Sequence, residues 1–320
     1  MTSLPQTPGH LSDVPTELMI EQYGGAVESQ FHKSVNMREF VPIRPVLGTD
    51  TITNNRVGRT ALQALVPGVR PPATPTQFGR VSLTVDTVII ARDNRSMLNE
   101  FQTHFDARVE LGKDHGKEIA KFFDQAFLIQ AIKGAGQAAP ANLNGAIGAG
   151  KSITLAAPGD ETDADALYAA IASIITQMED EDADVSELVI FVSPATFEVL
   201  MQSDKLLSRD FADGNGDYAK GTLYSLKGAR IVKTTRIPDA VITGHMLSNA
   251  NNGNAYDINA TEARTVAVVM HPKSLFAGET IPMSSAVYFS DVEKQWFIDS
   301  WIAFAVTVNR PDVCGRVLKA

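Results

Sequence analysis

Apolar residues recur every three or four positions in several parts of the chain, and this spacing predicts amphipathic helices. The longest covers residues 96–132 and is about 55 Å long if it is continuous, at about 1.5 Å per residue. Shorter helices are predicted at residues 17–33, at 163–178 with Asp163 as the N-cap, and at 196–201 after Pro194. The apolar face of the longest helix, which we interpret as core packing, consists of Phe105, Val109, Gly112, Gly116, Ile119, Phe123 and Phe127.

Runs rich in β-branched and aromatic residues predict the strands. Phe40–Pro45 contains two prolines, so we expect an extended segment at the edge of a sheet rather than a helix or a central strand. The other expected strands are Thr49–Thr53, Arg80–Ile90, Ser152–Ala156, Glu187–Val192, Ala229–Thr234, Thr265–Met270 and a final pair, Val287–Phe289 and Gln295–Val308.

The connection between the strands at 49–53 and 80–90 is rich in proline. Val66–Pro75 holds four prolines in ten residues, which makes this connection stiff and open. We interpret the region as a long two-stranded hairpin with an irregular tip. Neither such an arm nor a bare long helix can bury itself in one subunit, so the pattern indicates assembly with neighbouring copies.

The charge is distributed unevenly. The chain has 37 acidic and 28 basic residues, and its net charge of -9 makes it a poor candidate for gripping nucleic acid through phosphate contacts. The hairpin is nevertheless basic, because only Asp50 and Asp86 oppose its arginines. It is either a solvated surface or a docking element for an acidic neighbour, and charge alone leaves both open. The arginines are Arg44, Arg56, Arg59, Arg70 and Arg80.

Composition narrows the class of protein. A length of 320 residues suggests about two domains, and 44% hydrophobic with 20% charged residues is typical of a globular protein. Cys314 is the only cysteine, which excludes an intrachain disulfide and a cysteine zinc site and suits a reducing cytosol; we expect it to be an inert thiol. We expect no signal peptide, because the N-terminus lacks a basic stretch followed by an apolar one, and no membrane span, because the apolar runs are too short.

One motif has the letters of a phosphate-binding loop. Gly145–Ser152 matches G-x-x-x-x-G-K-[ST], in which the lysine reaches phosphates and the hydroxyl binds magnesium. Such a site needs a strand before it and a helix after it. Here residues 136–142 do not form a strand pattern, and residues 153–159 alternate like a strand. We therefore predict a non-enzyme with no catalytic, cofactor or metal site. A nucleotide-binding enzyme using Gly150, Lys151 and Ser152 is the alternative, which ATP binding with a Lys151→Ala control separates.

Four stretches, in this order, resemble the major capsid protein of short-tailed, T7-like bacteriophages, which has the HK97 fold. They lie between Pro45 and Asp312, and it is their order that carries the resemblance. The stretches are Pro45–Gly48 with Gly58–Leu62 and Val66–Gly68; Val85–Ile90 leading into the helix at Phe105–Ile132; Ala166–Met178, an acidic turn and Glu187–Pro194; and the terminal strands closing in Asn309–Asp312.

The resemblance implies an α+β fold with an extended β-hairpin loop. The implied parts are an N-terminal arm at 1–45, the extended loop at 46–92, a peripheral domain with a long spine helix and long strands at 93–165, an axial domain at 166–264, and a return to the peripheral domain at 265–320. Copies would form hexamers and pentamers that close into an icosahedral virion shell around double-stranded DNA, bound without sequence specificity. A cellular nanocompartment shell with the same fold is a closer alternative than the enzyme.

The implied partners are a separate scaffolding protein, a portal protein and, in some relatives, a decoration protein, with assembly in the host cytoplasm. Some members of the wider fold cross-link a loop lysine to a neighbour's asparagine. From Gly48 to Ile90 this chain has no lysine, so we expect non-covalent closure. We hypothesise that Arg56, Arg59, Arg70 and Arg80 contact carboxylates of a neighbour's peripheral domain, with Glu100, Asp106, Glu110 and Glu118 as candidates.

Overall fold

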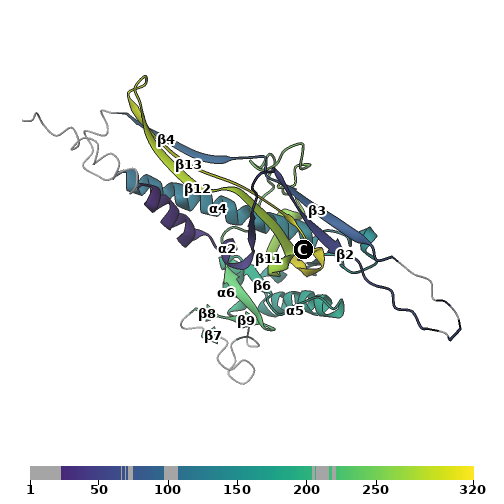
Figure 1. The fold of residues 1–320 in the computed structure, drawn as a ribbon. Coiled ribbons are helices and arrows are strands. Elements are labelled where there is room, and N and C mark those ends of the chain that lie inside the picture. The colour runs from purple at the N-terminus through teal and green to yellow at the C-terminus, as the bar shows by residue number, and fades with distance from the viewer. Residues whose placement is uncertain are drawn as a thin grey trace, which may run out of the picture. The chain divides into compact units, whose positions relative to one another are not determined.

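The structure is a computed structural model that describes residues 23–65, 67–68, 70, 75–96, 107–203, 206, 216–217 and 221–320. Helices and strands follow one another in mixed order, as in an α+β protein (Figure 1). The chain forms two compact units. In its described part, the first contains residues 23–36, 86–96, 107–124 and 279–304, and the second contains residues of 37–85, 125–278 and 305–320.

The first unit is built on the long helix α4 (Ala107–Ala135), whose residues up to 124 belong to it. Strand β4 (Ile89–Ser96) pairs antiparallel with β13 (Gln295–Val308), from Ser96 opposite Gln295 to Ile89 opposite Ile302. The four-stranded sheet that contains this pair has the order β1-β12-β13-β4, where β1 (Ile43–Pro45) and the first residues of β12 (Leu275–Ser290) belong to the second unit. Since β1 is an edge strand, the extended edge predicted around Pro42 is confirmed.

A helix at residues 23–34 packs against α4 at glycines. A Cβ atom at Gly116 would lie 2.5 Å from the backbone oxygen of Val27, so only glycine allows this approach. Phe31 lies one turn after Val27, and its ring meets the ring of Phe123 of α4 edge to face, with centroids 5.8 Å apart. Both side chains are fully buried. From Gly112 to Phe127 the predicted stripe on the long helix therefore packs a core, as expected, whereas Phe105 lies outside the described residues.

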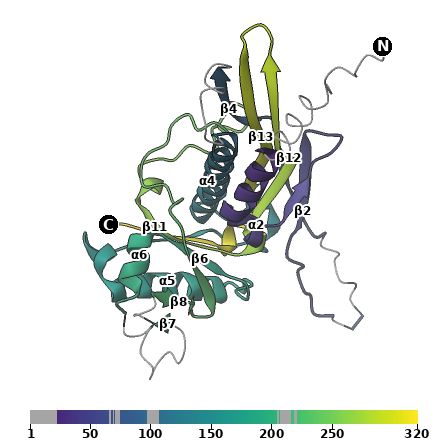
Figure 2. The same ribbon diagram turned by 90° about the vertical axis from the view of Figure 1, so that its left-hand side faces the viewer.

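The second unit contains a six-stranded sheet with the order β5-β14-β11-β6-β10-β9. Every residue of the neighbouring strands β11 and β6 is buried, as expected of strands covered on both faces. Helix α5 packs on this sheet through Ile171, Ile174 and Met178, and a Cβ at Gly315 of β14 would collide with Ile174 (Figure 2). The strands are β5 (Lys151–Thr154), β14 (Cys314–Leu318), β11 (Thr265–Met270), β6 (Val189–Val192), β10 (Ala229–Lys233) and β9 (Ser225–Leu226), and the helices are α5 (Ala164–Asp180) and α6 (Pro194–Leu200).

The remaining elements are short, apart from the hairpin of β2 (Thr51–Val57) and β3 (Phe78–Thr84). They are α2 (Met37–Phe40), the two-residue strands β7 (Gly216–Asp217) and β8 (Thr222–Leu223), and the 3-10 turns η1 (Ala141–Leu143), η2 (Asp160–Thr162), η3 (Glu262–Arg264), η4 (Pro272–Ser274) and η5 (Pro311–Val313). No helix in the described ranges is long and apolar enough to cross a membrane.

The predicted boundaries of the long helix and of the strand at 80–90 are wrong. The long helix does not begin at Ser96, because that residue ends β4, and α4 is described only from Ala107; the residues between lie outside the described part. Residues 80–90 are not one strand either. The chain leaves the hairpin at Val85, whose N–H donates to the backbone oxygen of Asp50 at 2.9 Å, and β4 then pairs with a different partner.

Candidate functional site

The strands β2 and β3 form a hairpin, and the described chain beyond their paired ends projects from the rest of the second unit (Figure 1). Its strands pair antiparallel from Thr51 opposite Thr84 to Val57 opposite Phe78. One further bond extends the pairing, from Gly58 N–H to the oxygen of Gln77 at 2.7 Å. Beyond it, the described residues up to 77 have no helix or strand. Most of the predicted tip, Val66–Pro75, lies outside the described residues, so its irregular conformation stays a prediction.

The base of the hairpin is tied to its own unit. Arg59 N–H donates to the oxygen of Leu143 at 3.2 Å, and the Leu143 side chain is fully buried. A Cβ at Gly58 would lie 2.8 Å from the oxygen of Gln77, and one at Gly79 would lie 3.0 Å from Leu143 Cδ2. The two glycines therefore allow the strands to close over Leu143, which orients the projecting part.

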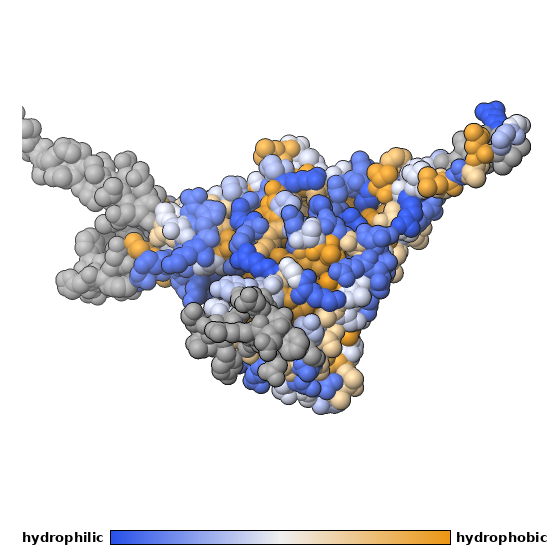
Figure 3. Space-filling model, turned by 90° about the horizontal axis from the view of Figure 1, so that it is seen from below, coloured by the Kyte–Doolittle hydropathy of each residue, from blue (hydrophilic) through white to orange (hydrophobic). Residues whose placement is uncertain are grey.

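The projecting part exposes large apolar side chains, which the sequence analysis missed. Leu62 is 96% exposed, and Leu65, Phe78 and Val57 are exposed as well. Figure 3 shows hydrophobic residues among hydrophilic ones along this arm. Exposed apolar groups gathered on one element mark an interaction surface. The available signal was the presence of large apolar residues in a segment that had been predicted to lack packing partners.

The four predicted hairpin arginines have different surroundings. Arg59 Nη2 lies 4.0 Å from Asp182 Oδ2, and both side chains are largely exposed. Arg56 is half-buried and donates from Nη2 to the oxygen of Val308 at 3.1 Å. Arg70 and Arg80 are exposed, and among the described residues neither has a carboxylate within 4.0 Å. Arg70 and Arg80 are thus the two hairpin arginines without a carboxylate partner in the described part of the subunit.

Two of the predicted acceptor carboxylates are exposed on α4. Glu110 accepts from Lys113 Nζ at 2.6 Å. Glu118 is paired with Lys121 in the same i,i+3 arrangement. An incoming arginine would therefore compete with a lysine at each carboxylate. Glu100 and Asp106, the other two candidates, lie outside the described residues. Contacts between these groups and a neighbour's arginines stay a prediction.

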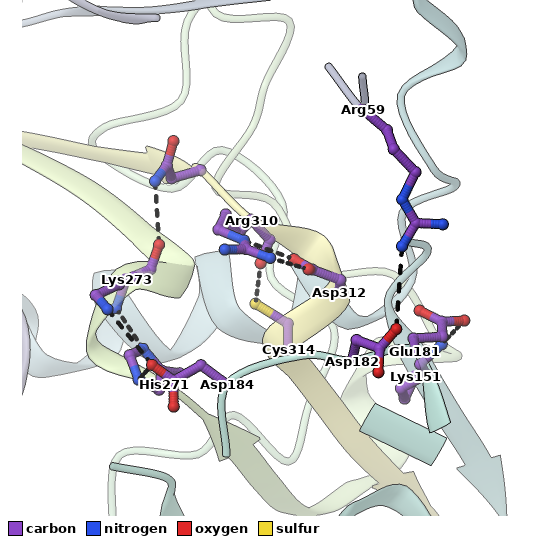
Figure 4. Close-up of polar contacts among 11 residues, drawn as sticks. Arg59, Lys151, Glu181, Asp182, Asp184, His271, Lys273, Arg310, Asp312 and Cys314 are labelled. Carbon is purple, nitrogen blue, oxygen red and sulfur yellow. Dashed lines mark hydrogen bonds and ion pairs between the residues drawn. The ribbon is translucent and has the colours of Figure 1, made fainter. Parts of the chain in front are cut away.

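The acidic turn after α5 forms polar contacts within the second unit (Figure 4). Asp184 Oδ2 lies 3.5 Å from Lys273 Nζ and 3.7 Å from the buried His271 Nε2. Hydrogen bonds from the hydroxyl and backbone N–H of Ser186 lower the pKa of Asp184 to about 2. The turn is therefore held as a fixed anionic feature beside Arg59.

The motif Gly145–Ser152, which matches a phosphate-binding loop in sequence, lies beside this acidic turn. Lys151 begins strand β5, so the strand expected after the motif is confirmed, and the helix that a phosphate-binding loop needs does not follow it directly. The Lys151 side chain is buried and its Nζ is paired with Glu181 (Figure 4). A Cβ at Gly150 would collide with the backbone of Gly134, so this glycine serves chain packing. The lysine is occupied by a carboxylate of its own chain.

A serine, histidine and aspartate also meet in the first unit. His115 Nε2 lies 2.9 Å from Asp93 Oδ2, and its Nδ1 lies 3.4 Å from Ser300 Oγ. Ser300 is fully buried, however, and its Oγ lies 2.6 Å from the Tyr23 hydroxyl. Burial raises the pKa of that hydroxyl to about 12. The group satisfies buried polar atoms and does not present a nucleophile to a substrate.

Two further chemical possibilities have little support. The only cysteine, Cys314, is fully buried, and burial raises the pKa of its thiol to about 12, as expected of an inert thiol. Within the described part of the chain, no cluster of three or more histidine, cysteine, aspartate and glutamate side chains is arranged to hold a metal ion.

Comparison with known proteins places this geometry in a family. A family profile described as Gp10A-like, major capsid protein, matches residues 83–276. The chain is similar to the mature capsid of bacteriophage PhiM1, with 27% identity, a TM-score of 0.76, and coverage of 87% of this chain and 84% of that one. It is also similar to the capsid of cyanophage P-SCSP1u, with 18% identity, a TM-score of 0.78, and coverage of 89% and 88%.

A more distant similarity extends beyond phages. The virus-like particle from Pyrococcus furiosus matches with 10% identity, a TM-score of 0.55, and coverage of 93% of this chain and 98% of that one. No curated protein matches the chain. The α+β, HK97-like capsid fold predicted from the sequence is confirmed by these structures. Because the family match covers more than half of its residues, the chain belongs to the Gp10A-like family of phage major capsid proteins.

Proposed function

We propose that this protein builds the icosahedral head of a short-tailed, T7-like phage by self-assembly as hexamers and pentamers around double-stranded DNA. It resides in the virion and assembles in the host cytoplasm. Family membership and the similarity to the PhiM1 capsid support this proposal. The net charge of -9 favours a shell that encloses DNA without gripping its phosphates or reading its sequence.

One observation carries the proposal: the hairpin exposes both apolar and cationic side chains that its own subunit leaves uncovered. Leu62 and Leu65 are exposed, and Arg70 and Arg80 lack carboxylate partners among the described residues. Laying this arm on a neighbour removes the apolar groups from water and brings the arginines to an acidic surface. The carboxylates Glu110 and Glu118 of a neighbour's α4 are candidates, together with Glu100 and Asp106.

Shell closure then depends on many weak contacts. An exposed ion pair contributes only about 0.2–1 kcal/mol. Each subunit is held at several places at once, so the contacts act together, while a misplaced subunit can still leave. A scaffolding protein guides closure, a portal protein replaces one vertex, and a decoration protein is a further possible partner of the outer surface.

The closure is proposed to be non-covalent, since no lysine is present between Gly48 and Ile90. Mature shells boiled in denaturant are therefore expected to give only the 34.5 kDa monomer on a denaturing gel. A ladder of multiples would contradict non-covalent closure.

The test is to express the chain with and without a candidate scaffolding protein and to image the products by negative-stain electron microscopy. Closed shells with scaffold, or hexamers and tubes without it, support the proposal. A matched control replaces residues 60–76 by a short Gly-Ser turn, which removes the projecting arm and keeps its base; it is expected to fold without forming shells. A persistent monomer or dimer of the unmodified chain under all conditions would contradict the proposal.

A nanocompartment shell is the second candidate, favoured by the similarity to the virus-like particle from Pyrococcus furiosus. That likeness is in fold alone, and the phage family match weighs against a nanocompartment. A phage head and a nanocompartment differ in what the shell encloses. Purified native particles that contain double-stranded DNA support the phage head, and particles that contain a protein cargo support the alternative.

A further inference from the structure

A polar cavity of about 210 Å³ lies at the base of the hairpin in the second unit. Strand β2 lines one side, and the turn after β13 lines the other. The two sides are joined by a hydrogen bond from Asn54 Nδ2 to Asn309 Oδ1 at 2.9 Å. The polar side of the cavity consists of Asn54, Asn55, Arg56, Asn309 and Arg310. Such a lining can offer several N–H donors to one guest.

The two arginines of the cavity differ in their partners. Arg310 is matched by the buried Asp312, with Nη2 to Oδ2 at 2.5 Å and Nε to Oδ1 at 3.2 Å (Figure 4). Arg56 has no such partner, because no carboxylate of the described residues lies within 4.0 Å of it. The cavity therefore has two guanidinium charges and one carboxylate to balance them.

Arg56 is also half-buried. Its Nε is buried and makes no hydrogen bond among the described residues, and its hydrogen bond there runs from Nη2 to the backbone oxygen of Val308. Burial lowers the pKa of Arg56, and the charge of Asp312 opposes this only in part. A cation that has lost water without gaining an anion is costly. An anionic guest in the cavity would remove that cost.

We propose that this cavity is an oxyanion site, in which Arg56 binds a carboxylate or phosphate group that its own subunit does not supply. The planar guanidinium presents its N–H groups in a fork that suits two oxygens of such a group, and the asparagine amides add donors. Metal cations are disfavoured by the excess of positive charge. Arg56 thus differs from the solvent-facing Arg80 of the same hairpin.

The oxyanion has two possible sources. One is an acidic side chain of a second copy of this chain, and this form of the inference rests on the proposed assembly. The other is free phosphate, which needs no assembly. In either case the guest would stabilise the base of the hairpin, because β2 supplies Arg56 and is bonded to the turn at Asn309.

The first arm of the test uses the unassembled subunit. Its melting temperature is measured in sodium phosphate and in sodium chloride of equal ionic strength, for the natural chain, Arg56→Gln and the control Arg80→Gln. Phosphate is expected to raise the melting temperature of the natural chain and of Arg80→Gln by several degrees more than that of Arg56→Gln. Asn55→Asp places a carboxylate at the cavity, and this variant is expected to fold and to lose the phosphate response.

The second arm uses assembled shells and distinguishes the two sources. Cryo-electron microscopy density that joins the cavity to an acidic side chain of a neighbouring copy identifies that residue as the guest, whereas isolated density identifies a free anion. Both results support the site. An equal phosphate response in all variants, or no response together with an empty cavity in the shell, overturns it. Because the first arm does not need assembly, its result is independent of whether the chain forms shells.

Discussion

The hairpin and the six-stranded sheet belong to the same unit but differ in how their side chains are covered. All ten residues of β6 and β11 are buried, whereas Leu83 is the one buried residue among the fourteen of β2 and β3. The sheet also packs against α5, through residues such as Ile174. The sheet is therefore stabilised by its own subunit, and the hairpin is stabilised mainly at its base.

This difference suggests that the residues of the sheet and those of the hairpin are constrained by different requirements, folding for the sheet and assembly for the hairpin. Residues of the sheet are constrained by the interior of the subunit, where packing density leaves no space for extra atoms. Residues of the projecting hairpin, such as Leu62, have no such constraint in the subunit, and we attribute their apolar character to contacts made after folding. Substitutions in the two regions should therefore affect different measurements.

The largest expected effect on stability is in the sheet core. Ile174→Ala removes a fully buried side chain and should lower the free energy of unfolding by about 2–5 kcal/mol. Leu62→Ala removes an exposed side chain and should change it by no more than about 0.5 kcal/mol, while reducing the yield of shells. Urea denaturation of the subunit and particle counts by electron microscopy give the two readouts. Equal destabilisation by the two variants would invalidate the comparison.

An intermediate effect is expected at the base of the hairpin. In Gly58→Ala the new Cβ would lie 2.8 Å from the oxygen of Gln77, and the resulting strain should cost about 1–3 kcal/mol. Hydrogen exchange of the β2 amides should accelerate, while that of β6 should not. Gly25→Ala is the matched control, because its Cβ meets no atom within 4 Å and the residue lies in a helix. Unchanged exchange in β2 would show that the base does not hold the hairpin.

A smaller effect on the subunit is expected from Arg59→Glu. The pair with Asp182 is long and exposed, so its loss should barely change the free energy of unfolding. Shell yield should nevertheless fall, because the reversed charge opposes the acidic surface of a neighbour. Arg59→Lys keeps the charge and serves as the control. Normal shells from Arg59→Glu would count against this arginine as a contact.

The smallest effect is expected from the pH dependence of the acidic turn. Asp184 has a folded-state pKa of about 2, below the ordinary value of about 3.9. Its contribution to stability is therefore present above about pH 4 and is lost as the pH falls toward 2. Asp184→Asn should be less stable than the natural chain at pH 5 and nearly equal to it near pH 2. A difference that does not shrink on acidification would contradict the assigned hydrogen bonds to Ser186.

Helices and strands whose residues follow one local pattern, such as a helix cap or a run of strand-forming residues, could be predicted from the sequence. Helix α5 begins after Asp163, whose carboxylate accepts from the Asp165 N–H, as the N-cap prediction required. Strands β11 and β13 have the predicted bounds because each is rich in β-branched and aromatic residues, although Asp299 and Ser300 interrupt the run in β13. The structure also has β1 at a sheet edge, where its proline is tolerated.

Elements defined by distant partners could not be predicted. Only residues 287–289 of β12 were expected, because Gly278 and Pro282 interrupt the pattern of this 16-residue strand. Its neighbour on one side, β1, has only three residues, so most of β12 has no paired strand along that edge. A proline, which has no backbone N–H to donate, is therefore tolerated there. Strand β14 was missed because it is short, contains Gly315 and gains its stability by pairing between β5 and β11.

The hairpin surface was predicted in part. Its arginines stand out in an acidic chain, but the sequence does not reveal that Arg56 faces a cavity while Arg80 faces solvent. That distinction depends on the approach of Arg56 to Val308, about 250 residues away in the chain. The exposed Leu62 and Leu65 were equally hidden, because apolar residues ordinarily indicate burial.

The most direct test of the account is hydrogen exchange, measured by mass spectrometry on the isolated subunit and on the assembled shell. If neighbours cover the hairpin, the amides of residues 60–65 will exchange rapidly in the subunit and will become protected in the shell. The amides of β6 and β11 will exchange slowly in both. Equally rapid exchange of residues 60–65 in the subunit and in the shell would contradict the claim that the hairpin is an assembly element.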